Sequence, residues 1–198
     1  MPKSTSFTKQ LVLASKSPRR KDLLEGIGMD FIVHPSNFEE KDGDMPPEDL
    51  VIHNAIGKAQ RVARHYKNSL IIGVDTVVVV EGHILGKPKN KEDAKRILRL
   101  LSNTTHKVIS GLCVMDTNSK KTISAIEETL VTIDRLDEED IENYVNSGEG
   151  SDKAAGYAIQ GKGSLFIKKI DGDYFNVVGL PIYKLRKILK EFGLKRLA

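Results

Sequence analysis

The stretch 70-LIIGVDTVVVV-80 is the most strand-like run in the chain, and it holds one carboxylate, Asp75, among apolar residues. β-Branched residues favour strands, and Glu81-Gly82 is a turn signal that predicts a short return strand. An unpaired carboxylate inside such a strand costs several kcal/mol unless another group compensates its charge. A metal ion or a proton relay would do so, as would hydrogen bonds from backbone amides or an arginine. We favour a functional role, because acids inside apolar strands are common at active sites.

Towards the N-terminus, 11-LVLASKSPRRKDLLEGIG-28 predicts a short buried strand that leads directly into a helix. Ser17 and Pro18 are typical of the N-cap and of the first helical position. The helix should end at Gly26 or Gly28, since glycine is common just after a helix. A loop that only connected the strand to the helix would not need two adjacent arginines at this point.

The positive charge at this helix start suggests an anion site. Unpaired backbone N–H groups and the helix dipole attract anions there. Ser15 adds a hydroxyl group, and Arg19 and Arg20 add planar guanidinium groups that suit phosphate oxygens. The alternative is a capped surface helix with solvated arginines.

The rest of the chain alternates between helix and strand patterns, without repeats or low-complexity linkers. We expect a strand over 31–33, a helix opening at 46-PPED-49, a helix capped by Asn90, a hairpin over 107–134, a helix from 137 to 147, a second hairpin over 165–179 and a basic helix over 181–198. The hairpins exclude a purely parallel sheet. The prediction is therefore a single α/β domain over 1–198 with a mixed β-sheet flanked by helices.

Several further polar residues are candidates for the same site. Glu39 and Glu40, in an acidic loop, offer oxygen ligands for Mg²⁺, although a solvated loop has the same composition. Lys58 and Lys87 could bind phosphates as point charges, yet most lysines face solvent. Gln160, in the glycine-rich stretch 152–166, carries both a carbonyl and an amide, which reading a base edge requires. A plain glycine-rich turn is the alternative there.

Composition narrows the class of protein. The 198 residues carry a formal charge of +4, which suits a phosphate-bearing partner, but much of the excess lies in the basic last helix. The single cysteine, Cys113, excludes an internal disulfide, and no apolar run reaches the ~20 residues that span a bilayer. We therefore expect a cytoplasmic protein. Walker, GxGxxG, GxSxG and HExxH motifs are all absent from the sequence.

Seven stretches, in order along nearly the whole chain, resemble those of the Maf family of nucleoside triphosphate pyrophosphatases. They are LASKSPRRKDLL, NAIGKA (54–59), GVDTVVVV, LGKP, LSNTTHKVISG (101–111), DKAAGYAIQG and IDGDYFNVVGLP. The resemblance implies an α/β fold with two lobes around a central cleft, similar to inosine triphosphate pyrophosphatases. It also implies hydrolysis of a nucleoside triphosphate to the monophosphate and pyrophosphate with a divalent metal, Mg²⁺ or Mn²⁺.

The resemblance also implies roles for individual residues. Asp75 matches the catalytic proton acceptor, and with Glu40 as helper it would hold the metal. The substrate-binding positions are matched by Ser15, Arg19, Arg20, Glu40, Lys58 and Lys87, and those associated with nucleotide choice by Arg19, Thr76 and Gln160. The AIQG form is similar to the branch that prefers dTTP and UTP. A homodimer is possible, whereas neither a nucleic acid nor a membrane partner is expected.

Two departures from the family pattern affect the loop that would cover the base. Ala155 replaces the glycine usual in DKAGxY, and GEGSDK lacks a tryptophan often found before this motif. Two alternatives to the dTTP/UTP reaction stay open. One is a pyrophosphatase for modified purine nucleotides such as 7-methyl-GTP. The other is a non-catalytic nucleotide- or nucleic-acid-binding regulator of cell division.

Overall fold

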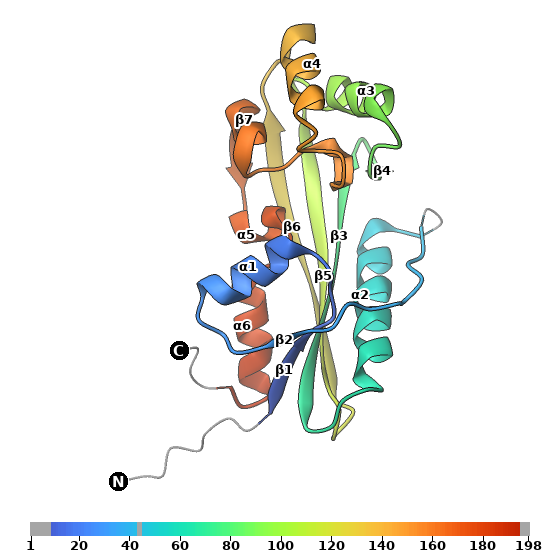
Figure 1. The fold of residues 1–198 in the computed structure, drawn as a ribbon, viewed down its shortest axis with the longest axis vertical. Coiled ribbons are helices and arrows are strands. Elements are labelled where there is room, and N and C mark those ends of the chain that lie inside the picture. Colours follow the sequence, from blue (N-terminus) through green and yellow to red (C-terminus); the bar gives the residue numbers. More distant parts are fainter. Residues whose placement is uncertain (1–8, 43–44, 195–198) are drawn as a thin grey trace.

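A computed structural model describes residues 9–42 and 45–194, and its centre is one long, twisted sheet (Figure 1). The described strands form a seven-stranded sheet in the order β2-β1-β3-β5-β6-β7, with β4 paired to β3. Their bounds are β1 (Gln10–Leu13), β2 (Ile32–Val33), β3 (Ser69–Val80), β4 (His83–Leu85), β5 (Thr105–Asp116), β6 (Thr122–Ile133) and β7 (Ile167–Asp171). β1 runs parallel to β2 and β3, and the other pairs are antiparallel. The predicted mixed sheet is confirmed.

Helices cover both faces of this sheet (Figure 1). They are α1 (Pro18–Gly26), α2 (Pro47–Ala63), α3 (Lys91–Leu101), α4 (Glu138–Ser147), α5 (Tyr174–Val178) and α6 (Ile182–Glu191), with short 3₁₀ turns η1 (Ala154–Gly156) and η2 (Gly161–Phe166). None of the helices within the described ranges is long and apolar enough to cross a membrane.

Two glycines let α2 lie unusually close to the sheet. A Cβ at Gly73 of β3 would sit 2.1 Å from the Ala55 carbonyl oxygen, and one at Gly111 of β5 would sit 2.3 Å from that of Val51. Both distances are far below a normal contact, so only glycine permits this approach. As a consequence, side chains on the inner face of α2 reach the centre of β3.

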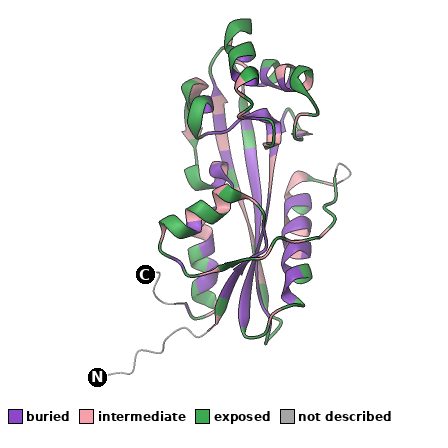
Figure 2. Cartoon of the chain, in the orientation of Figure 1, coloured by how far each residue is buried: buried purple, intermediate pink, exposed green. Residues whose placement is uncertain are grey.

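The sheet extends through two lobes, each with its own core. One core packs α3 and α4 against the distal ends of β3, β5 and β6, with Leu98, Leu101 and Ile133 fully buried. At the other end of the sheet, α1 and α6 cover one face and α2 covers the opposite face. Figure 2 shows the buried residues concentrated along the strands between these helices. The single domain expected over 1–198 stays a prediction.

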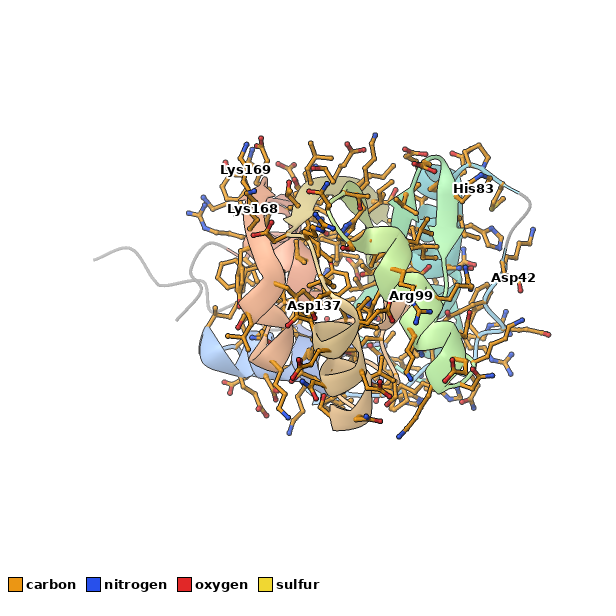
Figure 3. All side chains as sticks on the ribbon, turned by 90° about the horizontal axis from the view of Figure 1, so that it is seen from above. Asp42, His83, Arg99, Asp137, Lys168 and Lys169 are labelled. Carbon is orange, nitrogen blue, oxygen red and sulfur yellow. The ribbon has the colours of Figure 1, made fainter. Side chains whose placement is uncertain are left out.

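The lobe that contains α3 and α4 exposes a strongly charged surface. Seen from above, Arg99 of α3 and Asp137 at the start of α4 lie on neighbouring helices (Figure 3). Ion pairs link the two helices, with Arg99 Nη2 2.7 Å from Glu138 Oε2 and Lys95 Nζ 3.0 Å from Glu142 Oε1. Such exposed pairs contribute little individually, so buried apolar contacts hold these helices in place.

Most of the predicted helix ends are confirmed. The Asn90 side chain accepts a hydrogen bond from the Asp93 amide, and Asp137 forms a capping box with Asp140. Gly148 ends α4 with a φ of 74°, a left-handed conformation that glycine adopts without steric cost. The basic helix has its buried apolar residues on one side, but α6 ends at Glu191, and 195–198 lie outside the described residues.

The second predicted hairpin, over 165–179, is wrong. β7 pairs with β6 instead, and the chain after Asp171 turns into the short helix α5. Asp173 caps α5 by accepting a hydrogen bond from the Phe175 amide, which is the role that an aspartate takes at a helix start. Within α5, the buried Asn176 donates to the Val108 carbonyl oxygen. Asp171-Gly172, the turn signal at the tip of the expected hairpin, therefore marks a strand-to-helix corner.

His106 predicts a pH dependence of stability. Burial lowers its pKa from 6.5 to about 4, so the folded protein holds the ring neutral while the unfolded chain protonates it below pH 6.5. Stability from this group is complete above pH 6.5 and is lost as the pH falls towards 4. The wild type should lose about 3 kcal/mol more than His106→Gln across this window, as measured by urea unfolding. His83→Gln, at an exposed position, should follow the wild type; parallel curves for all three proteins would contradict the assignment.

Candidate active site

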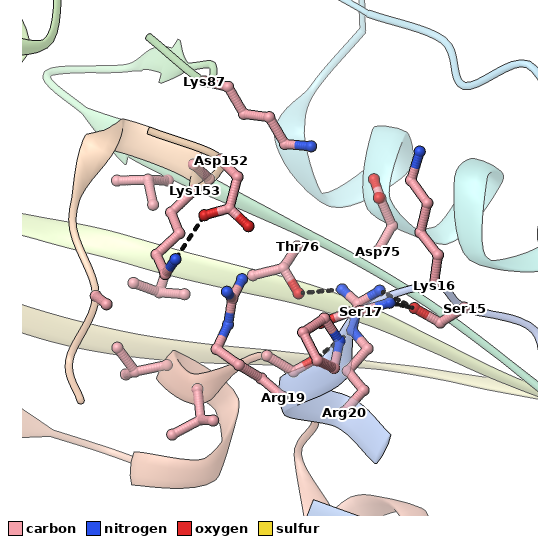
Figure 4. Close-up of a pocket in the computed structure, with 18 of the residues that line it drawn as sticks. Ser15, Lys16, Ser17, Arg19, Arg20, Asp75, Thr76, Lys87, Asp152 and Lys153 are labelled. Atoms are coloured by element: carbon pink, nitrogen blue, oxygen red, sulfur yellow. Dashed lines mark hydrogen bonds and ion pairs between the residues drawn. The ribbon is translucent and has the colours of Figure 1, made fainter. Parts of the chain in front are cut away.

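A cavity of about 580 Å³ opens between the two lobes, and its walls come from elements far apart in the sequence (Figure 4). All the residues singled out in the sequence line it, except Glu39: Ser15, Arg19, Arg20, Glu40, Lys58, Asp75, Thr76, Lys87 and Gln160. It is also lined by polar residues not selected in advance, among them Lys16, Asp152 and Lys153. The remaining wall is largely apolar and includes Val78, Val108, Tyr157 and Val178.

Asp75 lies at the base of this cavity and is only 7% exposed. Its Oδ1 accepts a hydrogen bond from Lys58 Nζ at 2.7 Å, and its Oδ2 accepts one from Asn54 Nδ2 at 3.0 Å. Both donors come from α2, which the glycines of the sheet allow to approach. The carboxylate is therefore hydrogen-bonded by an ammonium and an amide, and the nearby Arg20 guanidinium adds an electrostatic attraction to it.

Lys58 connects this acid to the acidic loop. Its ammonium lies 2.8 Å from Glu40 Oε1, so it stands between the two carboxylates. The Asn54 side chain holds the same loop, since Oδ1 accepts from the Lys41 amide at 2.9 Å and Nδ2 donates to the Lys41 carbonyl oxygen at 3.1 Å. Asn54 was missed in the sequence, although its position four residues before Lys58 puts both on one face of the helix.

Most N–H groups of Arg20 donate hydrogen bonds to other residues of the protein. Its guanidinium donates to the Gly179 and Val74 carbonyl oxygens, to Ser15 Oγ and to Thr76 Oγ1, at distances from 2.7 to 3.1 Å. These bonds use four of its five N–H groups, and burial lowers its pKa from the usual value. Arg20 thus joins α1, β3 and the segment between α5 and α6, which differs from the free phosphate-binding fork expected from the sequence.

Arg19 and Lys87 face the open cavity. Figure 4 shows Arg19 and Lys87 reaching towards it from opposite sides, with Asp152 between them. Asp152 Oδ1 lies 2.5 Å from Lys153 Nζ, and this hydrogen bond lowers the pKa of Asp152. Ser15 Oγ accepts from the Ser17 amide, which leaves the hydroxyl proton available to a ligand. The arrangement suits a polyanion bound across the cleft.

Ala155, the departure noted in the sequence, occupies a left-handed backbone conformation with a φ of 54°. A residue with a Cβ is strained there by about 1 kcal/mol relative to glycine. Its amide donates to the Gly86 carbonyl oxygen at 2.9 Å, next to Lys87. The turn at Ala155 therefore holds the loop that carries Lys87.

The donor set near Asp75 fits a divalent cation that shares its coordination with a substrate. Mg²⁺ is commonly held by one or two carboxylates together with phosphate oxygens. Asp75 and Glu40 provide two carboxylates on either side of Lys58 Nζ. Across 9–42 and 45–194, no group of three or more His, Cys, Asp or Glu side chains is placed to hold a metal without such help.

The site combines a buried acid with a cleft lined by cations in a mixed α/β fold. This combination is typical of proteins that bind phosphorylated ligands. The family model described as Maf-like protein matches residues 10–192, and the chain belongs to the Maf family. A dTTP/UTP pyrophosphatase from Dictyoglomus thermophilum is 48% identical over 187 residues, covering 93% of this chain and 97% of the relative. A dTTP/UTP pyrophosphatase from Methanosarcina barkeri is 46% identical over 187 residues, covering 93% and 95%.

Among solved structures, the Ham1 protein of Staphylococcus aureus is similar with a TM-score of 0.54 at 18% identity. The match covers 92% of this chain and 99% of that one. At this identity the likeness concerns the fold alone, and it agrees with the mixed α/β arrangement described above.

The different surroundings of the two arginines predict different effects of substitution. Arg20→Lys should lower the free energy of unfolding by about 2–4 kcal/mol, because an ammonium cannot reach all four acceptors and leaves some of them unpaired. Arg19→Lys is the matched control and should cost less than about 0.5 kcal/mol, as for an ordinary surface change. Urea unfolding at pH 7 measures both. Equal losses in the two variants would contradict the structural role of Arg20.

Proposed function

We propose that this protein is a nucleoside triphosphate pyrophosphatase that hydrolyses dTTP and UTP to the monophosphate and pyrophosphate. The observation that carries the proposal is the buried Asp75 carboxylate, held by Lys58 and Asn54 at the base of a cavity lined by cations. The dTTP/UTP pyrophosphatases that are 48% identical over 93–95% of the chain support the same substrate class.

In the proposed reaction, the triphosphate lies across the cleft with its α-phosphorus near Asp75. Arg19, Lys87 and the Ser15 hydroxyl bind phosphate oxygens, while Arg20 keeps Ser15 and Thr76 in place. Asp75 accepts a proton from the water that attacks the α-phosphorus, and pyrophosphate leaves. Lys58 sits beside the acid and donates towards the charge that develops on the phosphates. Catalysis here comes mainly from positioning and electrostatic stabilisation.

We also propose that Asp75 and Glu40 hold a divalent cation, Mg²⁺ or Mn²⁺, together with the substrate. When bound, the cation neutralises negative charge on the phosphates. The basis is the chemistry of the donor set, two carboxylates that face one another across Lys58. Lys58 would then shift its ammonium from between the acids towards the phosphates.

Base selection is assigned to Gln160, Thr76 and Arg19. Gln160 lies on the exposed rim of the cavity, where its amide can meet a pyrimidine carbonyl and ring N–H. Thymine and uracil differ by one methyl group, worth about 1–3 kcal/mol in a pocket, so one site can accept both. The cytoplasm is the proposed compartment. The proposal includes neither a nucleic acid nor a membrane partner, and it leaves a homodimer as an expectation.

Asp75→Asn tests the reaction itself. Turnover of dTTP should fall by about two orders of magnitude or more, the effect of removing a general base. The variant should still fold, with a lower thermal midpoint, because the new amide directs its N–H groups at Lys58 or Asn54. Release of pyrophosphate with Mg²⁺ or Mn²⁺ is the measurement. Asp22→Asn, an exposed substitution on α1, is the matched control and should retain full activity. Equal rates for both variants would remove Asp75 from the mechanism.

Gln160→Glu tests base selection. A carboxylate cannot donate to a base carbonyl, so the preference for dTTP over GTP should fall by about tenfold. The ratio of kcat/KM for the two nucleotides measures this effect, and an unchanged ratio would place base reading elsewhere. Measuring pyrophosphate release from a wider panel of nucleoside triphosphates that includes 7-methyl-GTP distinguishes the dTTP/UTP reaction from the modified-purine alternative. A protein that binds DNA with a steep salt dependence and hydrolyses no nucleotide would support the regulator instead.

A further inference from the structure

The loop that carries Gln160 is held from behind by a carboxylate that the proposed reaction does not use. Glu149 follows the glycine that ends α4, and it lies outside the cavity lining. Its Oε2 accepts a hydrogen bond from the Lys162 amide at 2.9 Å, and its Oε1 accepts one from the Gly163 amide at 3.0 Å. Two backbone amides just beyond Gln160 are therefore fixed by one side chain.

Tyr144 completes the support on the other side of Gln160. Its hydroxyl donates to Glu149 Oε1 at 3.1 Å and accepts a hydrogen bond from the Ala158 amide at 3.0 Å. The ring is 5% exposed and packs edge-on against Phe166. Glu149 and Tyr144 thus hold the chain at Ala158, two residues before Gln160, and again at Lys162, two residues after it.

The residue next to Gln160 shows how closely the loop follows this support. Gly161 has a φ of 77°, and a Cβ there would lie 2.4 Å from Glu149 Oε2. Both the conformation and the position of the Glu149 carboxylate therefore favour glycine. The backbone turns directly over the carboxylate, and the preceding residue, Gln160, lines the cavity.

Glu149 is suited to this task because it is ionised. Burial raises its pKa, but the hydrogen bonds from the Lys162 and Gly163 amides and from Tyr144 outweigh burial and lower the pKa below the usual value. An ionised carboxylate accepts hydrogen bonds at both oxygens and donates none, which matches three donors. A neutral amide at this position would direct its own N–H groups at a backbone N–H.

We propose that Glu149, together with Tyr144, is a positioning residue that sets base selectivity by fixing the orientation of Gln160. This inference rests on the proposed function and adds to it a determinant outside the cavity. Glu149 acts only through the loop, so its removal should weaken discrimination between bases and leave the phosphate chemistry at Asp75 largely intact.

The first test compares Glu149→Gln with Glu142→Gln, an equal loss of charge on the exposed side of α4. Glu149→Gln should reduce the preference for dTTP over GTP in kcat/KM by about tenfold, the scale of one lost oriented hydrogen bond to a charged group. The change should come through KM for dTTP, with kcat within about twofold of the wild type. Glu142→Gln should behave as the wild type. Tyr144→Phe, which keeps the ring and the carboxylate, should show a smaller shift in the same direction.

The second test asks whether Glu149 acts through Gln160. In a Gln160→Ala background, Glu149→Gln should cause no further loss of selectivity, because the group that it positions is already gone. If the selectivity loss of the double variant equalled the product of the losses of the two single variants, the proposal would be overturned. A Glu149→Gln enzyme with wild-type selectivity would also overturn it. If Glu149→Gln does not fold, Tyr144→Phe provides the same comparison.

Binding of the products separates this inference from the proposed function. Titration calorimetry with dTMP and GMP measures base selectivity without any turnover. A wild type that releases no pyrophosphate would refute the proposed reaction. The dTMP-to-GMP affinity ratio would still fall about tenfold in Glu149→Gln if the loop support is correct. An unchanged affinity ratio would overturn the inference whatever the activity.

Discussion

The site depends on one contact between secondary structure elements, the close approach of α2 to the middle of the sheet. Gly73 and Gly111 remove the two side chains that would hold the helix away. Lys58 and Asn54 therefore reach Asp75, which would otherwise be an uncompensated charge inside an apolar strand. The same contact brings the acidic loop to the cavity, because Asn54 and Lys58 each bind it as well.

Around Asp75, some polar residues face the cavity, and others hydrogen-bond within the protein and hold the segments that line the cavity in place. Arg20 ties three segments together with four hydrogen bonds, whereas Arg19, its neighbour, faces the cleft. Glu149 and Tyr144 hold the rim at Gln160 in the same indirect way. Adjacent charged residues in one motif thus serve different purposes, and only their hydrogen-bond partners tell them apart.

Much of the fold was predictable from local patterns. The apolar run around Asp75, the Asn90 cap, the helix that begins at the acidic residues from 137 and the hairpin of β5 and β6 each have a local physical cause, and all were confirmed. The hairpin over 165–179 failed because the turn signal Asp171-Gly172 is followed directly by Asp173, which caps a helix, and the buried Asn176 ties that helix to β5. That contact involves the Val108 carbonyl oxygen, a partner 68 residues away in the chain.

The sequence alone determined which chemical groups are present and the order of the elements that carry them: an acid in an apolar strand, cations at a helix start and a glutamine among glycines. The tertiary structure decided which of these groups are paired and which are free. It made Lys58 a buried partner of Asp75, and it committed the Arg20 guanidinium to hydrogen bonds that join three segments of the protein. It also showed that Asn54 positions Asp75 and that Glu149 holds the loop of Gln160. The physical reason is that hydrogen bonds and burial depend on neighbours brought together by folding, and spacing along one chain does not encode them.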